Sequence, residues 1–320
     1  MKRILTLVRS ILVGALVSAS SAQACDLCAV YASLEAKEAA KGWSVGIFEQ
    51  YTHFGTLREE GERVSNPLEQ QMNSSITQAF VGYQFSSTFG IQANVPYIRR
   101  AFRRAEGGVA ETGSESGLGD SVLLARWRPV LHIDGDSLFA VTLLGGIKLP
   151  TGSSDRIAEE LAETPEAPGE IASGIHGHDL ALGSGSTDGL LGVSGFWRYR
   201  RAFANASMQY TARSRGDFHY RYADDLNWSF NPGVYLDLSH ENTFTAGVAL
   251  SGEHKGQDDL AGEPTDDTAI DAVYLGPQIT YSRGASFYAD FAADFPLRQR
   301  NSALQEVADY RIRLAITWRP

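Results

Sequence analysis

The pattern that most constrains this chain starts at Trp43, where apolar and polar side chains begin to alternate in runs of about eleven to thirteen residues. Strict alternation predicts β-strands with one apolar and one polar face. Strands in soluble proteins average about five or six residues, whereas a tilted strand needs about nine to eleven to cross a bilayer. Twelve runs can be placed, at residues 43–54, 74–85, 89–100, 118–130, 137–149, 187–199, 203–213, 227–238, 242–252, 270–282, 285–296 and 307–319.

The breaks between these runs alternate strictly in length. Short breaks lie near residues 86–88, 131–136, 200–202, 239–241 and 283–284. Long breaks lie near residues 55–73, 101–117, 150–186, 214–226, 253–269 and 297–306. An even number of strands, with short turns at one end and long loops at the other, is typical of outer-membrane barrels, whose periplasmic turns are short. The sequence therefore predicts an all-β fold, a 12-stranded antiparallel transmembrane β-barrel over residues 43–320.

Alternation also predicts which side chains face lipid and which face the lumen. Ile312 and Leu314 share one face of the last strand, while Arg311 and Arg313 share the other. Charged rings set ion selectivity in pores, and a basic row favours anions, including aromatic carboxylates. The alternative is that opposite charges pair across the lumen and brace the barrel. The charged residues expected to point inward are Arg126, Arg128, Lys148, Arg198, Arg213, Arg311, Arg313, Asp237, Asp290 and Asp294.

Two further details of the sequence bear on how the predicted barrel sits in the membrane. Aromatic residues near the short-turn ends predict an interfacial girdle. Glu49 lies in register with the apolar Val45 and Ile47, so we expect a bulge or a slip toward the lumen at this point. The proposed girdle comprises Trp43, Tyr83, Trp127, Trp197, Tyr199, Tyr281 and Trp318.

The N-terminus predicts export. Residues 1–24 combine a basic start, a short apolar run and the small-residue pattern Ala22-Gln23-Ala24, as in a removed signal peptide. Outer-membrane localisation follows, with outer-membrane lipid, lipopolysaccharide and the barrel-assembly machinery as expected partners. A net charge of −10 argues against nucleic-acid binding.

Residues 25–42 form the one stretch with helical periodicity, expected at the periplasmic mouth or in the lumen as a candidate plug. It contains both cysteines of the chain, Cys25 and Cys28. A local disulfide is the default in an oxidising compartment. A soft-metal site, for example for copper(I), and a redox role for an electron-transfer partner are the alternatives. No other cofactor is predicted.

The longest break contains polar and glycine-rich signals. Pro150, Thr151 and Gly152 follow a predicted strand, and Gly145 and Gly146 precede them, so a close backbone approach or a bend is expected. Asp120 and Asp188 follow glycine-rich turns, where a carboxylate can order a loop by accepting backbone hydrogen bonds. The loop is a candidate gate that either folds into the pore or stands outside it. His176 and His178 within it could contribute to a metal site, although loop histidines often bind nothing.

Three of these stretches also carry a family resemblance. GLGD at 117–120, GGIKLPTG at 145–152 and LGSGSTDG at 182–189 resemble motifs of the outer-membrane barrel "transporter" family of the meta pathway of phenol degradation. The resemblance implies a channel that admits small, often aromatic, compounds and has no catalytic residues.

An outer-membrane lipid hydrolase is the enzyme alternative. It needs a Ser nucleophile beside a His base. The adjacent Ser239 and His240 lie in a predicted periplasmic turn, and neighbours on a strand point to opposite faces. The sequence therefore predicts a channel for small solutes rather than an enzyme.

Overall fold

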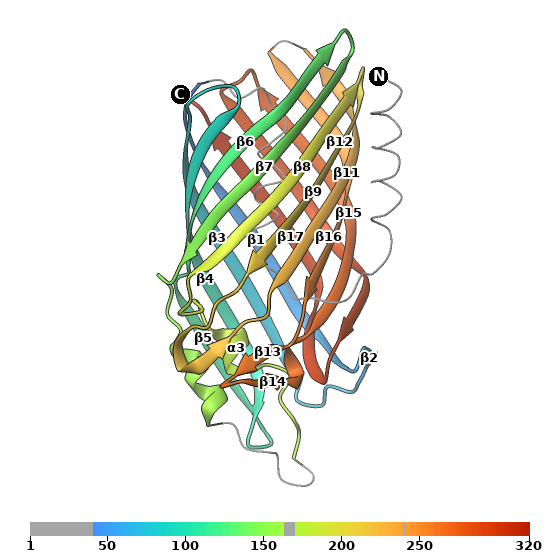
Figure 1. The fold of residues 1–320 in the computed structure, drawn as a ribbon. Coiled ribbons are helices and arrows are strands. Elements are labelled where there is room, and N and C mark those ends of the chain that lie inside the picture. Colours follow the sequence, from blue (N-terminus) through green and yellow to red (C-terminus); the bar gives the residue numbers. More distant parts are fainter. Residues whose placement is uncertain (1–40, 163–169, 240) are drawn as a thin grey trace, which may run out of the picture.

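The computed structural model describes residues 41–162, 170–239 and 241–320. These residues form a closed antiparallel barrel of 12 strands, which confirms the predicted fold class. Neighbouring strands are adjacent in sequence, and β17 pairs with β1 to close the barrel (Figure 1). The strands are β1 (Gly42–Glu59), β3 (Gln71–Gln84), β4 (Phe89–Glu106), β6 (Ser121–Asp134), β7 (Ser137–Leu149), β8 (Asp188–Tyr199), β9 (Ala202–Ala212), β11 (Asp225–Leu238), β12 (Asn242–Lys255), β15 (Ile270–Arg283), β16 (Phe287–Asn301) and β17 (Leu304–Trp318).

Several strands continue beyond the predicted limits at the long-loop end. The predicted long break at 297–306 is wrong, because β16 and β17 extend through it and only Ser302 and Ala303 connect them. Ala303 has a positive φ of 44°, and the Asn301 side chain donates to its carbonyl oxygen at 2.9 Å. The break at 101–117 is likewise a hairpin of β4 and β5 (Val109–Leu118), turning at Gly107 and Gly108.

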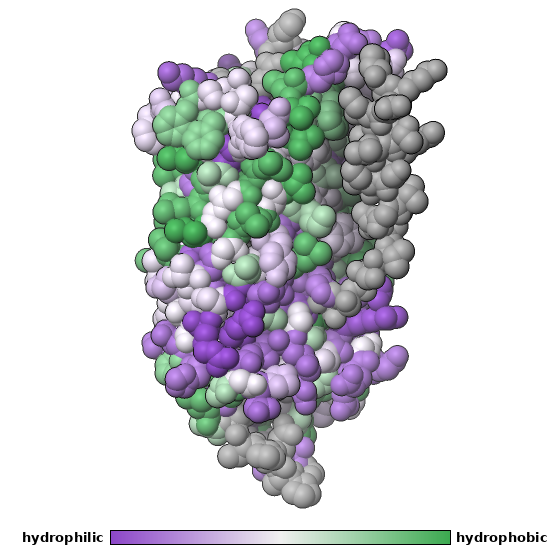
Figure 2. All heavy atoms as spheres, viewed as in Figure 1, coloured by the Kyte–Doolittle hydropathy of each residue, from purple (hydrophilic) through white to green (hydrophobic). Residues whose placement is uncertain are grey.

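The predicted partition of side chains is confirmed along most of the barrel. Ile312 and Leu314 are exposed on the outside, whereas Arg311 and Arg313 are buried inside. Figure 2 shows that apolar residues cover the outer surface toward the short-turn end and that polar residues cover the long-loop end. A band of this kind matches the lipid-facing surface of a transmembrane barrel, so the long-loop end projects beyond the bilayer.

Aromatic residues mark the short-turn border of this band. Trp43, Trp127 and Trp318 are more than half exposed on the outer surface. The ring of Trp43 contacts Tyr83 edge to face, with centroids 4.9 Å apart. These positions agree with the predicted interfacial girdle.

Two expectations about register are corrected. Glu49 stays in register on the outer face, where it accepts hydrogen bonds from the hydroxyls of Ser75, at 2.6 Å, and Thr77. These bonds satisfy its carboxylate without a bulge, and the shifts in register come later, between His53 and Thr56. Asp237, expected in the lumen, lies after a bulge in β11 that places it opposite Phe244 of the exposed outer face, so its side chain is exposed.

Short elements extend the barrel at the long-loop end (Figure 1). A separate three-stranded sheet, β10-β13-β14, lies among them. No helix among the described residues is long and apolar enough to span a membrane. The predicted signal peptide and most of the 25–42 segment, with both cysteines, lie outside the described residues. The further short elements are β2 (Glu62–Arg63), β10 (Tyr220–Arg221), β13 (Asp258–Leu260), β14 (Glu263–Thr265), η1 (Asp155–Leu161), η2 (Asp217–His219), η3 (Asp266–Thr268) and the helix α3 (Gly177–Leu180).

Candidate functional site

The three glycine-rich motifs meet at one buried lysine. Lys148, near the end of β7, faces inward and is only 4% exposed. Its Nζ lies 2.6 Å from Asp120 Oδ2 and 2.9 Å from Asp188 Oδ2. Asp120 also accepts hydrogen bonds from the backbone amides of Gly152 and Ser184, both at 3.0 Å. Each motif therefore contributes to one ionic cluster, which agrees with the loop-ordering role predicted for the two aspartates.

The cluster continues along the rim of the lumen through a second cation. Arg213, just after β9, binds Asp188 at 3.3 Å and Asp225 at 2.6 Å. Asp188 also accepts a hydrogen bond from the amide of Ser214 at 2.9 Å. Carboxylates and cations thus alternate over the ends of β6, β7, β8, β9 and β11. Lys148 and Arg213 face inward as predicted, but both are occupied by this structural network.

Glycine is required where the motifs touch. A Cβ on Gly152 would lie 2.7 Å from the carbonyl oxygen of Leu182 and 2.9 Å from the backbone of Gly119. A Cβ on Gly183 would lie 2.6 Å from the backbone of Gly152. The expected close approach is thus correct for Gly152. It is wrong for Gly145, whose added Cβ would meet nothing within 4 Å.

The loop between β7 and β8, residues 150–187, is called the mouth loop below. Its described C-terminal part folds into the barrel end rather than standing outside. Ile175 and Leu180 pack against the inward-facing Met72, and Leu182 packs against Ile98. Of the two placements left open by the sequence, the structure has the inward one.

A buried histidine fixes α3 within the mouth loop. His178 is 5% exposed, and its Nδ1 lies 3.0 Å from Glu160 Oε1. Burial alone would lower the pKa of His178, but the carboxylates of Asp179 and Glu160 raise it to about 10. Burial alone would raise the pKa of Glu160, but His178 lowers it to about 2. At neutral pH, His178 is therefore a protonated imidazolium and Glu160 an ionised carboxylate.

A second contact ties the mouth loop to the β4–β5 hairpin. Arg156 in η1 donates through Nε to Glu115 of β5 at 2.8 Å. Arg104 of β4 binds Glu159 of η1 at 2.8 Å and Glu111 of β5 at 2.7 Å. The η1 part of the mouth loop is therefore attached to the β4–β5 hairpin by ion pairs.

Pro150 and Thr151 occupy the junction between β7 and the mouth loop. Pro150 is exposed, and the Thr151 hydroxyl donates to the Gly119 carbonyl oxygen at 2.9 Å. His176 lies 3.2 Å from Asp267, and its ring stacks on that of His178. Among the described residues, no group of three or more His, Cys, Asp and Glu side chains is arranged to hold a metal ion.

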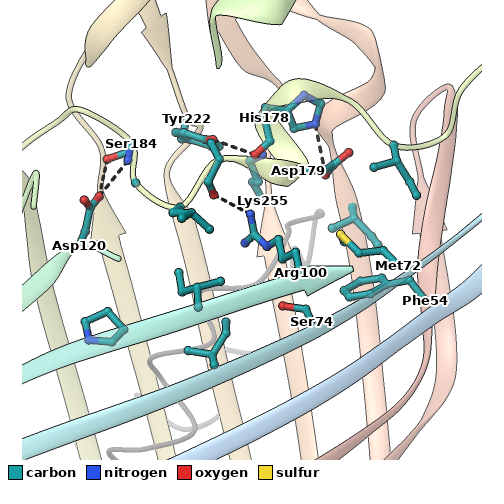
Figure 3. A pocket seen from close by; sticks show the side chains of 18 of the residues that line it. Phe54, Met72, Ser74, Arg100, Asp120, His178, Asp179, Ser184, Tyr222 and Lys255 are labelled. Carbon is teal, nitrogen blue, oxygen red and sulfur yellow. Dashed lines mark hydrogen bonds and ion pairs between the residues drawn. The ribbon is translucent and has the colours of Figure 1, made fainter. Parts of the chain in front are cut away.

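A cavity of about 240 Å³ lies between the mouth loop and the barrel wall (Figure 3). One part of its lining is apolar and another is charged. Figure 3 shows Arg100 beside Met72 and Phe54, with Tyr222 and Lys255 on the other side. The apolar and aromatic lining includes Phe54, Met72, Ile98, Leu182 and Tyr274, and the cationic lining includes Arg100, Lys148, Arg213, Lys255 and Arg311.

The two predicted lumen arginines on β17 are both paired. Arg313 binds Asp294 through two hydrogen bonds of 2.6 and 3.0 Å. Arg311 binds Glu253 through two bonds of 2.7 and 2.9 Å, and it lies 4.0 Å above the ring of Tyr274. Both arrangements brace the barrel across strands, which favours the bracing alternative for this pair of arginines.

The remaining predicted lumen residues lie closer to the short-turn end. Arg126 and Arg128 on β6 are half-buried beside the exposed Trp127, and Arg198 on β8 is half-buried beside the exposed Trp197. Asp290 on β16 is buried and accepts a hydrogen bond from Gln278 at 2.7 Å. The part of Arg126, Arg128 and Arg198 in selectivity stays a prediction.

Two residues of this site were not predicted. Arg100 was placed at the very end of a strand, although it shares the inward parity of Ile98 on β4. Glu253 was placed in a loop, but β12 continues to Lys255 and turns its carboxylate toward Arg311. Extending the predicted run at 242–252 by one residue would have included Glu253, whereas Arg100 already lay within the predicted run at 89–100.

An apolar outer band, a polar lumen and a loop-closed end together define a membrane-spanning β-barrel of the outer-membrane class. No protein-family model and no curated protein matches the sequence. Among solved structures, an outer membrane channel from Pseudomonas putida F1 is similar, with a TM-score of 0.62 and 14% identity over 88% of this chain and 96% of that one.

Two autotransporter domains are also similar in outline. The β domain of Bordetella BrkA has a TM-score of 0.46 and 11% identity, over 88% of this chain and all of that one (100%). The translocator domain of Neisseria meningitidis NalP has a TM-score of 0.42 and 12% identity, over 91% of this chain and 92% of that one. The likeness to the Pseudomonas channel establishes the barrel fold that the motif resemblance implies.

Proposed function

We propose that this protein is an outer-membrane channel for the diffusion of small, aromatic or anionic solutes, gated by the mouth loop at its extracellular end. The observation that carries the proposal is the cavity between the mouth loop and the lumen, which has apolar and charged walls and a volume of about 240 Å³. Sites for small molecules are typically apolar clefts with a few placed polar groups.

Polar groups deeper in the lumen support the same function. Both polar atoms of the Gln78 side chain are buried without a hydrogen-bond partner among the described residues, as are Asn231 Oδ1 and Thr317 Oγ1. Buried polar groups are normally satisfied by protein or water. These side chains, on β3, β11 and β17, therefore favour a lumen that holds water or polar solute.

The hydrolase alternative has less support. Ser239 Oγ donates to the Asn242 backbone oxygen at 2.7 Å within the short turn, and His240 lies outside the described residues. The second alternative, a metal or redox role of Cys25 and Cys28, also falls outside them. Contact of the outer loops with lipopolysaccharide and assembly by the barrel-assembly machinery remain part of the proposal.

Liposome swelling tests the proposal directly. We expect liposomes that contain the protein to take up small solutes faster than protein-free liposomes, and uptake to slow steeply with solute size. A form that lacks residues 25–42 tests the proposed plug, because uptake only after this deletion would identify that segment as the block. No uptake in either form would overturn the channel function.

A further inference from the structure

The cavity under the mouth loop has one wall suited to a small apolar body. Met72 and Phe54 approach from one side, and Ile98 and Leu182 from another. Its volume of about 240 Å³ is below the roughly 300–1,000 Å³ that is typical of sites for drug-sized ligands. The space therefore fits a single ring or a short chain better than a long acyl chain.

The opposite wall is rich in cations, and nearly all of them are already neutralised. Lys148 and Arg213 share Asp188, and Arg311 forms its double hydrogen bond with Glu253. Lys255 lies 2.7 Å from Asp258. None of these side chains needs a further anion.

Arg100 differs from the other lining cations. Its Nη1 donates to the carbonyl oxygen of Ala181 at 2.6 Å, which fixes the guanidinium against the mouth loop. Among the described residues, its Nε is buried without a hydrogen-bond partner, and no carboxylate lies within 4.0 Å of the guanidinium. Glu115, directly opposite on β5, is bound instead to Arg156.

An arginine whose Nε has no partner among the described residues favours the binding of an anion. A buried charge without a partner is costly, and the edge of a guanidinium formed by Nε and a terminal nitrogen matches the two oxygens of a carboxylate. Arg100 is the one lining cation without a described carboxylate partner, so one carboxylate of a solute can pair with it, whereas the lining carboxyl groups of Asp179 and Glu306 disfavour a second negative charge. A dianion would lack a second free cation.

We propose that this cavity binds a small monocarboxylate with an aromatic or short aliphatic body, and that Arg100 binds the carboxylate while Met72, Ile98 and Leu182 contact the body. The inference deepens the proposed function, on which it rests, by naming the class of permeant. Binding itself can be measured without transport, so the two can fail separately.

The test is equilibrium binding to the full mature chain in detergent micelles, with protein-free micelles to correct for partition. Three probes distinguish the contribution of the carboxylate from that of the ring: benzoate has both, benzyl alcohol is its neutral ring analogue, and acetate has the carboxylate alone. We expect benzoate to bind at least about tenfold more tightly than benzyl alcohol, since a hydrogen bond to a charged group contributes about 1.5–3 kcal/mol and 1.4 kcal/mol is tenfold. We expect a similar preference over acetate, because the ring of benzoate buries apolar surface that acetate lacks.

Variants at neighbouring positions provide the matched control. Arg100→Gln should weaken benzoate binding about tenfold or more and leave benzyl alcohol unchanged, and Arg100→Lys should give an intermediate loss. Arg99→Gln removes the same charge from the exposed outer face of β4 and should leave the affinities for benzoate and benzyl alcohol unchanged. Circular dichroism and heat-modifiable migration show whether each variant is folded.

Four results would overturn the inference: equal binding of benzoate and benzyl alcohol, equal binding of benzoate and acetate, an equal loss in Arg99→Gln and Arg100→Gln, or no binding of benzoate. If benzoate fails to bind but liposomes still swell, the channel stands without this site. If benzoate binds and no solute enters liposomes, the site stands and the channel function fails.

Discussion

Lys148 and Arg100 line the same cavity, yet their surroundings differ completely. Lys148 lies between two buried carboxylates and joins three sequence motifs. Arg100 has one fixed contact, to a backbone carbonyl of the mouth loop. A cation with all of its partners inside the protein holds the structure together, whereas a cation with a free edge is available to a solute. The predictions below test this contrast, from the largest expected effect on stability to the smallest.

Removing Lys148 should have the largest effect. Lys148→Met leaves Asp120 buried without its cation and Asp188 with Arg213 alone, and breaking a buried pair typically costs about 3–5 kcal/mol. We expect the mouth loop to detach, which makes Arg156 accessible to trypsin and lowers the free energy of unfolding. Lys41→Met, at an exposed position, is the control. A Lys148→Met protein with a protected loop would show that the cluster does not hold the mouth loop.

The pair of His178 and Glu160 should make closure depend on pH. The pKa of His178 rises from 6.5 to about 10 on folding, so its contribution is complete below pH 6.5 and is lost as pH rises through 10. The pKa of Glu160 falls from 4.5 to about 2, so its contribution is complete above pH 4.5 and is lost as pH falls through 2. The mouth loop should therefore be most firmly closed between about pH 4.5 and 6.5.

Channel conductance as a function of pH measures this dependence. We expect conductance to rise between pH 7 and 10 as the loop loosens, and His178→Gln to remove that rise. His132→Gln, at an exposed position near the short turns, should keep the parent profile. An unchanged profile in His178→Gln would exclude this histidine as the source.

A methyl group at the meeting point of the motifs should have a moderate effect. Gly152→Ala places a Cβ within 2.9 Å of backbone atoms on two other segments, and overpacking of this kind costs about 1–3 kcal/mol. Gly145→Ala meets open space and should be neutral. Urea titrations of both variants measure the difference, and equal midpoints would argue against close packing of the motifs.

Arg100→Gln should have the smallest effect on stability. The substitution loses one hydrogen bond to Ala181 but also removes a partly buried charge that lacks a described carboxylate partner, so we expect a change below about 1 kcal/mol. The measurement is the urea midpoint beside that of Lys148→Met. If both variants were equally destabilised, Arg100 would be another structural cation and the contrast would disappear.

The sequence alone predicted the barrel because the bilayer imposes a strict pattern. Every strand inside the apolar band must alternate, so the twelve strands and the outward positions of Ile312 and Leu314 could be inferred. Outside the bilayer the constraint ends. Gln299, Asn301 and Gln305 are polar on strands that project into water, and the hairpin there was therefore taken for a loop.

The candidate site was predictable only in part. Asp120, Lys148 and Asp188 were each singled out, but nothing in the sequence pairs residues from three motifs spread over residues 117–189. The inward fold of the mouth loop depends on Ile175, Leu180 and Leu182, whose irregular spacing gives no periodic signal. Arg100 was missed because only the closed barrel shows which cations already have partners.

The central claim is that the lumen is a solute path closed by the mouth loop. Single-channel recording in planar bilayers tests it most directly, with the parent protein compared with a variant in which residues 155–181 are replaced by a short Gly-Ser linker. The motif glycines and the Lys148 cluster remain in this variant. We predict low or intermittent conductance for the parent and a larger, steady conductance for the variant. Equal conductance in the two proteins, or none in either, would contradict the account.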